Sequence, residues 1–227
     1  NLANNSGVIA ADVSGVGTAR TNLAAATYGQ DKAVFGYGET SSYLSLKNLA
    51  NNVGVIAADV SGVGTARAQL AATGYGDLTA GTAMFAYGFT YDGSFNTFSV
   101  KNLVSNTGVI AADVTGVGTA RIGLAAARYS TDKAVFAYGS TANATHVSVS
   151  NKVAANGTIA SDTSGVGTAR RSLSAARYGG DKAVFAYGGG VVSLKNLVNN
   201  SGGFASDVTG VGTARNATSA GGYSMSA

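Results

Sequence analysis

The sequence predicts an all-β fold, in the form of a β-propeller of about five four-stranded blades. The first observation is a repeat: Gly-Val-Gly-Thr-Ala-Arg occurs five times, at intervals of 47, 54, 49 and 45 residues, and such periods are typical of propellers and solenoids. The second is that short apolar runs, separated by glycine and asparagine, recur within each unit. The third is a composition with 33 glycines and 11% charged residues, which suits short strands and tight turns. The five copies are Gly15–Arg20, Gly62–Arg67, Gly116–Arg121, Gly165–Arg170 and Gly210–Arg215.

Four runs in the first unit are expected to form strands. The segment Thr21–Tyr28 is rich in alanine, which suits a crowded position near a central axis, and Lys32–Tyr37 follows it after a turn. The third strand is expected near Tyr43–Leu49, and the fourth over Gly54–Val60, after a turn at two asparagines. The second run is apolar on both faces, as strands are in sheets that lie between neighbouring sheets. Four short strands, repeated radially, describe a propeller blade.

The repeats divide residues 1–227, taken as a single domain, into four complete units and a closing blade. The complete units span about residues 15–61, 62–115, 116–164 and 165–209. Residues 210–227 and 1–14 are expected to form the closing blade together, which would leave no exposed sheet edge. The alternative is a β-solenoid, although its rungs usually keep one length and these units do not.

Composition and charge argue against several classes of function. The net charge is +4, from 15 basic and 11 acidic residues without a basic run, so a nucleic-acid partner is not expected. The chain has no cysteine, which excludes disulfides and thiolate metal sites. No apolar run approaches the ~20 residues of a membrane helix, so membrane insertion is not expected.

The order of segments within a unit resembles a known repeat family. The pattern R-x-x-L-A-A-A-x-Y-G, followed by D-K-A-V-F-A-Y-G and then by a strand leading to the next G-T-A-R, resembles the kelch-type blade. The resemblance covers almost the whole chain, and it implies that the expected propeller is built from kelch-like repeats.

A second resemblance concerns function. GVGTAR followed by DKAVFAYG is similar to repeats of tail-fibre and other virion proteins of bacteriophages. This implies a non-enzymatic structural or host-recognition protein of the virion, such as a tail-fibre, appendage or capsid-decorating domain. Its partners would be other virion proteins, or a glycan or receptor on the host surface, and it would be homo-oligomeric or present in many copies. The alternative is a secreted or cell-surface lectin-like module, with an extracellular location.

Each copy of the repeat also carries an aspartate eight residues before its arginine. Because these residues recur in every copy, we interpret them as structural pairs at the interfaces between units, with arginine bonding to aspartate or to turn carbonyls. The glycines of the motif are expected to form a turn between units, since a phosphate-binding loop would need a following helix. The pairs are Asp12 and Arg20, Asp59 and Arg67, Asp113 and Arg121, Asp162 and Arg170, and Asp207 and Arg215.

The loop between the second and third strands differs most from unit to unit, and loops on rigid scaffolds often carry binding. The four loops span residues 39–47, 89–101, 140–150 and 189–195. The second loop is rich in aromatic residues, which are expected to form a recognition patch for a sugar or a protein. The alternative is that Phe95 and Phe98 point inward and cover the blade. The candidate binding residues are Phe89, Tyr91, Asp92, Phe95, Phe98, Glu39, Tyr43 and His146.

No catalytic residue, cofactor or metal site is expected. His146 is the only histidine, which gives little support to a Ser-His-Asp triad or a transition-metal site. The segment Asp92–Asn96 faintly suggests a calcium loop but lacks the EF-hand spacing. An enzyme acting on polysaccharide is the weakest alternative, because it would need paired carboxylates. Few acidic residues lie outside the repeat pattern, namely Glu39, Asp77 and Asp92.

Overall fold

The structure is a computed structural model that describes residues 2, 6, 8–77, 79–142 and 144–222. Within these ranges it contains strands, turns and irregular segments, and the prediction of an all-β fold is confirmed. No helix in the described ranges is long and apolar enough to cross a membrane.

The strands form four three-stranded antiparallel sheets and one hairpin. The first sheet contains β1 (Ala24–Tyr28), β2 (Lys32–Gly36) and β3 (Lys47–Ala50). The second contains β4 (Ala71–Tyr75), β5 (Thr82–Ala86) and β8 (Lys101–Val104). The third contains β9 (Ala125–Arg128), β10 (Ala134–Ala137) and β11 (Ser150–Val153), and the fourth contains β12 (Ser174–Tyr178), β13 (Lys182–Ala186) and β14 (Lys195–Val198). The hairpin of β6 (Phe89–Tyr91) and β7 (Phe95–Thr97) is an insertion in the second unit.

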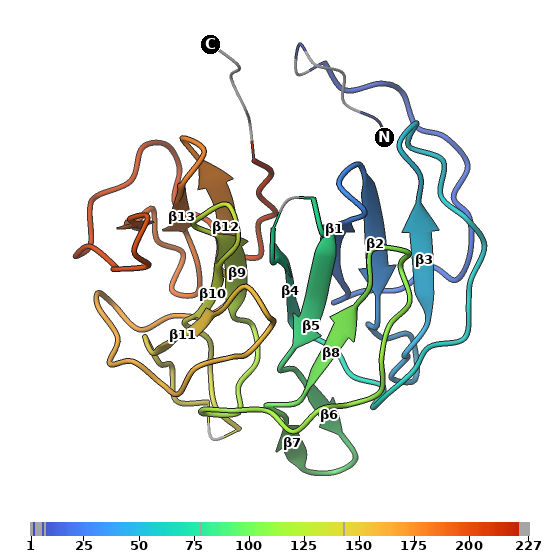
Figure 1. Ribbon diagram of the computed structural model, residues 1–227. Helices are drawn as coiled ribbons and strands as arrows, with labels where there is room; N and C mark the ends of the chain where they lie inside the picture. The colour runs from blue at the N-terminus through green and yellow to red at the C-terminus, as the bar shows by residue number, and fades with distance from the viewer. Residues whose placement is uncertain (1, 3–5, 7, 78, 143, 223–227) are drawn as a thin grey trace.

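The four sheets stand side by side with their first strands together (Figure 1). Strand β1 packs against β4, β4 against β9, and β9 against β12. These four strands consist mainly of alanine and other small residues, so neighbouring strands can approach one another closely. The second strand of each sheet lies between the first and the third.

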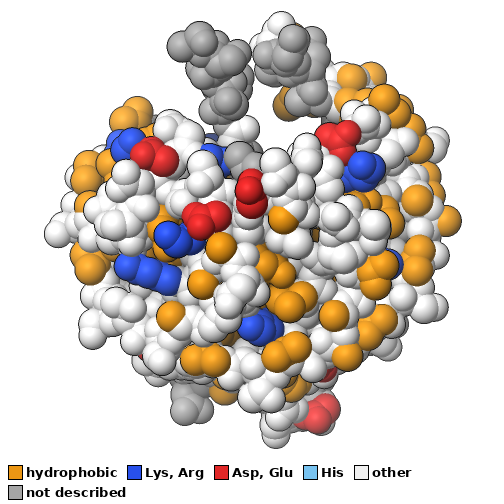
Figure 2. Space-filling view, in the orientation of Figure 1, with side chains coloured by type: hydrophobic (Ala, Val, Ile, Leu, Met, Phe, Trp, Pro, Cys, Tyr) orange, Lys and Arg blue, Asp and Glu red, His pale blue; other side chains and the backbone are white. Residues whose placement is uncertain are grey.

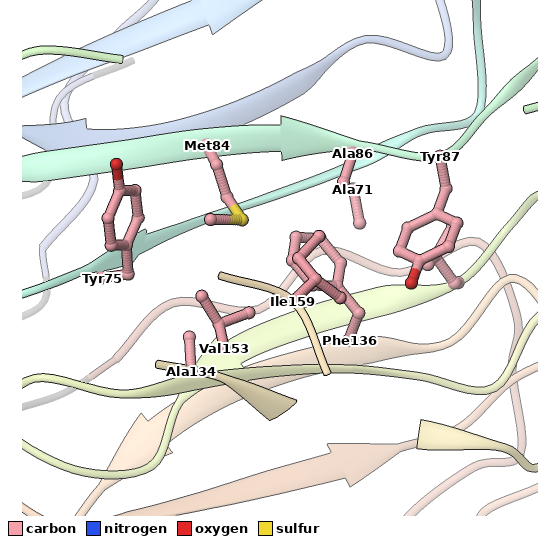
Figure 3. Packing of buried hydrophobic residues seen from close by; sticks show 10 residues of the cluster. Ala71, Tyr75, Met84, Ala86, Tyr87, Ala134, Phe136, Val153 and Ile159 are labelled. Atoms are coloured by element: carbon pink, nitrogen blue, oxygen red, sulfur yellow. The ribbon is translucent and has the colours of Figure 1, made fainter. Parts of the chain in front are cut away.

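The hydrophobic core lies between neighbouring sheets. Figure 3 shows the layer between the second and third units, where Met84 and Tyr87 meet Phe136 and Val153. All four side chains are fully buried. A middle strand that has a sheet on either side must be apolar on both faces, which explains the recurring Ala-Val-Phe sequence.

A row of backbone hydrogen bonds joins the starts of successive units. Five residues take part, and each has a left-handed backbone with φ between 49° and 60°. Left-handed φ values are uncommon for residues other than glycine, so their recurrence shows that the same turn opens each unit. The donor–acceptor pairs are Gln69 N with Asn22 O at 3.0 Å, Gly123 N with Gln69 O at 3.0 Å, Ser172 N with Gly123 O at 2.7 Å, and Ala217 N with Ser172 O at 2.9 Å.

The fourth strand expected in each unit does not form. In the first unit the segment 54–60 meets β3 through isolated bridges at Ile56 and Val60 and through a hydrogen bond from the Ala57 N–H to the Leu49 carbonyl at 2.8 Å. Between these bridges, the side chain of Asn48 donates to the carbonyl of Ala57 at 3.1 Å. The side chain of Asn48 therefore makes a hydrogen bond that a backbone N–H would make in a regular sheet. The prediction of a fourth strand was wrong. In the first unit, the apolar side chains of Val55, Ile56 and Val60 are exposed, whereas Ile110 and Ile159 of the next two units are buried although their segments also pair only locally.

The five-bladed propeller is also wrong. The sheets are separate, none is closed, and no pairing in the described ranges joins the two ends of the chain. Near the N-terminus, the Ala10 N–H donates to the Leu2 carbonyl at 2.8 Å, so this segment folds back on itself. Near the C-terminus, Thr218 bonds to Ser174 of β12 at 2.6 Å. The parts of the expected closing blade at residues 1, 3–5, 7 and 223–227 lie outside the described residues.

The physical reason for the open array lies in the ends themselves. Neither residues 1–14 nor residues 210–227 contain the apolar Ala-Val-Phe run that forms the middle strand of the other sheets. Without a middle strand, a first and a third strand have no partner to which they can bond. No continuous sheet runs through the units either, so a β-solenoid does not describe the fold.

Candidate functional site

The invariant arginine of each unit belongs to a buried scaffold. Arg67 is fully buried, and its guanidinium donates from Nε to the Tyr87 carbonyl at 2.7 Å. One terminal nitrogen donates to the Thr65 carbonyl at 3.0 Å, and the other donates to Asn102 Oδ1 at 2.8 Å. Hydrogen bonds of this kind offset the cost of burying a charge. Arg20, Arg121 and Arg170 make the same set of bonds in their own units.

The aspartate that meets each arginine comes from the following copy of the repeat. Asp113 accepts hydrogen bonds from the Thr65 backbone at 2.9 Å, from the Thr65 hydroxyl at 2.6 Å and from Asn102 Nδ2 at 2.8 Å. Burial opposes ionisation of Asp113, but the bonds from Thr65 and Asn102 outweigh it and lower the pKa of this carboxyl. Three of these arginines also lie within ion-pair distance of the aspartate: Arg20 and Asp59 are 3.7 Å apart, Arg67 and Asp113 are 3.9 Å apart, and Arg170 and Asp207 are 4.0 Å apart.

These partners differ from the pairs expected at a spacing of eight residues. Asp59, for example, lies beside Arg20 rather than beside Arg67. The reason is that the aspartate sits on the last segment of a unit, which folds back onto the sheet that the earlier arginine opened. Asp12 is exposed in the N-terminal segment, whereas Arg215 opens the fifth copy and contacts Tyr187.

A tyrosine joins each unit to the next. The guanidinium carbon of Arg67 lies 4.3 Å from the ring centre of Tyr37, in the preceding unit, which is the geometry of a cation–π contact. The Tyr37 hydroxyl also donates to the Val63 carbonyl at 3.1 Å. Burial raises the pKa of Tyr37 to about 12, so the hydroxyl stays protonated and remains a donor. The same contact recurs between Arg121 and Tyr87, Arg170 and Tyr138, and Arg215 and Tyr187.

We call the contacts among the arginine, the aspartate and the tyrosine of neighbouring units the joint. The two glycines of the repeat are required by this joint. Gly64 has φ of +86°, and a Cβ there would lie 2.6 Å from Asn102 Nδ2 and still closer to Asp113. A Cβ on Gly62 would overlap the carbonyl of Ser45. The glycines therefore permit close backbone packing, and their surroundings are protein groups rather than an open phosphate cradle.

Sequence patterns alone did not single out the asparagine that holds this joint together. Asn102 accepts from Arg67 and donates both to Asp113 and to the Ala111 carbonyl at 3.0 Å. Its recurrence in every third strand was the available signal. The equivalent residues are Asn48, Asn102, Asn151 and Asn196, and all four are buried.

With the repeated residues occupied in the scaffold, the variable end of the second unit is the strongest binding candidate. The hairpin β6–β7 pairs Phe89 with Thr97 and Tyr91 with Phe95, and Figure 1 shows it projecting beyond the sheets. The rings of Phe89 and Phe95 are stacked, with centres 5.7 Å apart and an interplanar angle of 21°. Tyr91 and Phe95 have centres 5.0 Å apart, and their exposed fractions are 53% and 52%.

The aromatic hairpin rests on a buried base. Phe89 is 7% exposed and packs with Ala68 and Ile122, residues of the second and third units. The ring of Tyr43, from the first unit, meets Phe89 edge-on at 5.7 Å. Residues from three units therefore fix the position of one ring, which in turn supports Phe95. We call Tyr43, Phe89, Tyr91 and Phe95 the aromatic surface.

The other expected binding residues have different roles. Asp92 accepts from the Ser94 N–H at 3.3 Å and from Asn96 Nδ2 at 3.0 Å, which stabilises the hairpin turn. Phe98 is half-buried. Tyr91 and Phe95 are exposed, so Phe95 does not take the inward position that was considered for it, whereas Phe89 is buried.

Glu39 and His146 occupy the corresponding loops of the first and third units. Glu39 accepts from Asn22 Nδ2 at 2.6 Å, and its backbone pairs with Thr21 and Tyr43. His146 is exposed and its backbone pairs with Ser140. Both residues belong to loops at the same end of the molecule as the aromatic surface, but neither is part of that surface.

Of the carboxylates considered for an enzyme, Asp77 is not brought together with Asp92. Asp77 lies in the turn between β4 and β5, whereas Asp92 follows β6, at the opposite end of β5. A strand of five residues spans about 17 Å, well beyond the separation of paired carboxylates in glycosidases. Among the described residues, no group of three His, Asp or Glu side chains is placed to hold a metal ion.

No protein-family model matches this chain. A comparison with curated proteins finds no match either.

Proposed function

We propose that this chain is a non-enzymatic binding module, and that the aromatic surface binds a host-surface glycan or an apolar group of a protein receptor. The observation that carries the proposal is the pair of half-exposed rings, Tyr91 and Phe95, supported by a ring that is itself buried. Ordinary exposed side chains do not require such a base.

Physical chemistry favours a binding role for rings held in this way. Aromatic side chains offer a large contact area at a low cost in conformational entropy, and the stacking of Phe95 on Phe89 lowers that cost further. The hydroxyl of Tyr91 adds a polar group beside the apolar ring faces. A sugar ring, with its apolar face and polar rim, matches that combination.

The setting that we propose is a virion. This part of the proposal rests on the similarity of the GVGTAR and DKAVFAYG segments to repeats of bacteriophage tail-fibre and virion proteins. A small aromatic surface gives modest affinity, and many copies on one particle would multiply it. Recovery of the chain with purified particles at a fixed stoichiometry would support this setting, and its absence from every particle fraction would contradict it.

Binding is tested with two substitutions on the hairpin. Phe95→Ser and Tyr91→Ser remove exposed rings and leave the buried Phe89 in place, so the fold should be retained. We expect each variant to lose at least tenfold in affinity for the glycans that the wild-type chain selects on a glycan array, or for host cells.

The matched control is Val53→Ser. Val53 is 69% exposed on a turn of the first unit, so this change also removes exposed apolar area but does not touch the hairpin. Equal binding by the wild type, Phe95→Ser and Tyr91→Ser would overturn the proposal. Equal losses in all three variants would show non-specific adhesion.

A further inference from the structure

The opposite end of the molecule holds a second place where the units disagree. A tyrosine ends or directly follows each first strand, and the residue before it is Thr27 in the first unit, Gly74 in the second, Arg128 in the third and Arg177 in the fourth. The neighbouring positions of these strands are mostly alanine. A long cationic side chain in this row is therefore a departure from the scaffold that packing between units does not require.

Arg128 extends from β9 across β4. One terminal nitrogen lies only 3.0 Å from where a Cβ of Gly74 would be, so the glycine makes room for the guanidinium. The other terminal nitrogen donates to the Gly76 carbonyl and, at 2.7 Å, to the Thr131 carbonyl. Nε is buried and has no hydrogen-bond partner in the described part of the chain. The guanidinium is thus anchored on one side and incompletely satisfied.

A cavity of about 270 Å³ lies beside this guanidinium. The first unit contributes a hydroxyl, an aromatic ring and an amide, the second contributes the turn before β5, and the third contributes the arginine. The volume is close to the lower end of small-molecule pockets, about 300–1,000 Å³, so it suits a single ring. The lining residues are Thr27, Tyr28, Gln30, Thr79, Gly81 and Arg128.

The charges near the cavity are mixed, with two arginines and two aspartates. Burial, followed by repulsion from Arg177, lowers the pKa of Arg128, and Asp132 and Asp77 act in the opposite direction. Asp132 accepts from the Ser130 hydroxyl at 2.7 Å, and Asp77 accepts from the Thr79 N–H at 3.0 Å. Like Arg128, Arg177 has a buried Nε without a partner among the described residues. In Figure 2, most of the acidic and basic side chains on this face of the molecule lie in the upper and middle parts of the view.

We propose that this cavity binds the carboxylate of an acidic sugar, with Arg128 as the anion-binding residue and Thr27 and Gln30 as partners for its hydroxyl groups. Guanidinium groups bind planar carboxylates through charge-assisted hydrogen bonds, and a bound anion would balance the repulsion between the two arginines. The site is independent of the aromatic surface, because it lies at the other end of the strands and shares no residue with it.

The test is titration of the full chain with glucuronate, glucose, acetate and sulfate, followed by calorimetry or by NMR shifts of the arginine side chains. We expect saturable binding of glucuronate, no saturation with glucose, and weaker binding of acetate, which lacks the ring. Arg128→Gln should weaken glucuronate binding at least tenfold. Thr27→Val should weaken it a fewfold, and because Thr27 is exposed this variant retains the fold.

The control is Arg171→Gln, which removes one positive charge at an exposed position away from the cavity lining. Glucuronate binding that is unchanged in this variant and reduced in the other two would support the proposal. Equal losses in Arg171→Gln and Arg128→Gln would show a general charge effect and overturn it. Equal affinities for glucose and glucuronate would overturn the role of the carboxylate, and sulfate binding as tight as glucuronate would overturn the sugar specificity.

Discussion

At the scale of single residues, the repeat is a set of mutually dependent positions. Thr65 and Asn102 hold Asp113, Asn102 also holds Arg67, and the ring of Tyr37 stacks on the same arginine from the preceding unit. The glycines admit this arrangement because no Cβ would fit beside it. The motif recurs unchanged along the chain because every copy forms the same joint. Substitutions within the motif should therefore affect stability before they affect binding.

The second glycine of the motif gives a direct test. Gly118→Ala should destabilise the chain by about 1–3 kcal/mol, because φ is +83° and the new Cβ would crowd Asn151 and Asp162. Gly15→Ala is the control, since a Cβ there has no neighbour within 4 Å. Urea unfolding of both variants measures the difference. Equal midpoints would show that the joint tolerates a side chain.

The aspartates of the joint predict how stability depends on pH. Hydrogen bonds from Thr18 and Asn48 lower the pKa of Asp59, and comparable bonds outweigh burial to lower the pKa values of Asp113, Asp162 and Asp207. A group with a lowered pKa in the folded state stabilises the fold above its unfolded value, here 3.8, and this contribution is lost as the pH falls through the folded value. We expect little change in stability between about pH 5 and 8 from these groups, and a steep loss below about pH 4.

The variant Asp113→Asn isolates one of these carboxylates. It should be less stable than the wild type at pH 7, by about 1–2 kcal/mol, and the difference should shrink as the pH falls through the lowered pKa of Asp113 and the wild-type carboxyl becomes protonated. Asp92→Asn changes the net charge equally but lies on the exposed hairpin. Urea unfolding from pH 2.5 to 7 checks the slope. A constant difference at all pH values would contradict the assigned role of Asp113.

At the scale of elements, the middle strands show what each sheet gains from its neighbours. Phe85, Phe136 and Phe185 are fully buried, whereas the equivalent Phe35 is only partly covered, because no sheet precedes the first unit in the described structure. At the other end of the array, Val184 is partly exposed although Val34, Met84 and Val135 are fully buried. The same sequence pattern therefore contributes different stabilisation at different positions.

This difference is measurable with one substitution at two positions. Phe136→Ala should cost about 3–5 kcal/mol, as deletion of a buried phenylalanine does. Phe35→Ala should cost less, about 1–2 kcal/mol, because part of its side chain is already in contact with solvent. Denaturant unfolding compares the two variants. Equal losses would mean that Phe35 is covered in solution, by another part of the protein or by another molecule.

At the scale of the whole molecule, the chain is an open array of four sheets whose stability depends on contacts between neighbours. The second and third units have a sheet on each side, and the first and fourth have one. The two ends of the strands also differ in chemistry, with the aromatic surface at one end and the Arg128 cavity at the other.

Hydrogen exchange should report this arrangement. We expect the slowest backbone exchange in β5 and β10, and faster exchange in β2 and β13, because terminal units open at a lower free energy than central ones. Amide exchange followed by mass spectrometry of peptides resolves the four strands. Uniform protection across all four would contradict an open array and indicate a single cooperative unit.

The sequence by itself determined the features that depend on neighbours along the chain. Glycine and asparagine placed the turns, and the Ala-Val-Phe runs produced middle strands within Lys32–Tyr37 and its counterparts. The repeated pattern also marked the arginines and aspartates as part of a scaffold and pointed to residues 89–101 as the most divergent loop. These predictions rest on local propensity and periodicity, which sequence carries directly.

Only the tertiary structure decided which residues meet. It placed Asp59 against Arg20 instead of Arg67, reduced the expected fourth strand to isolated bridges, left the array open and laid Arg128 across Gly74. The physical reason is that each of these outcomes depends on groups tens of residues apart, whose distances are set by how whole sheets pack. A spacing of eight residues says little about partners once the chain turns back between them.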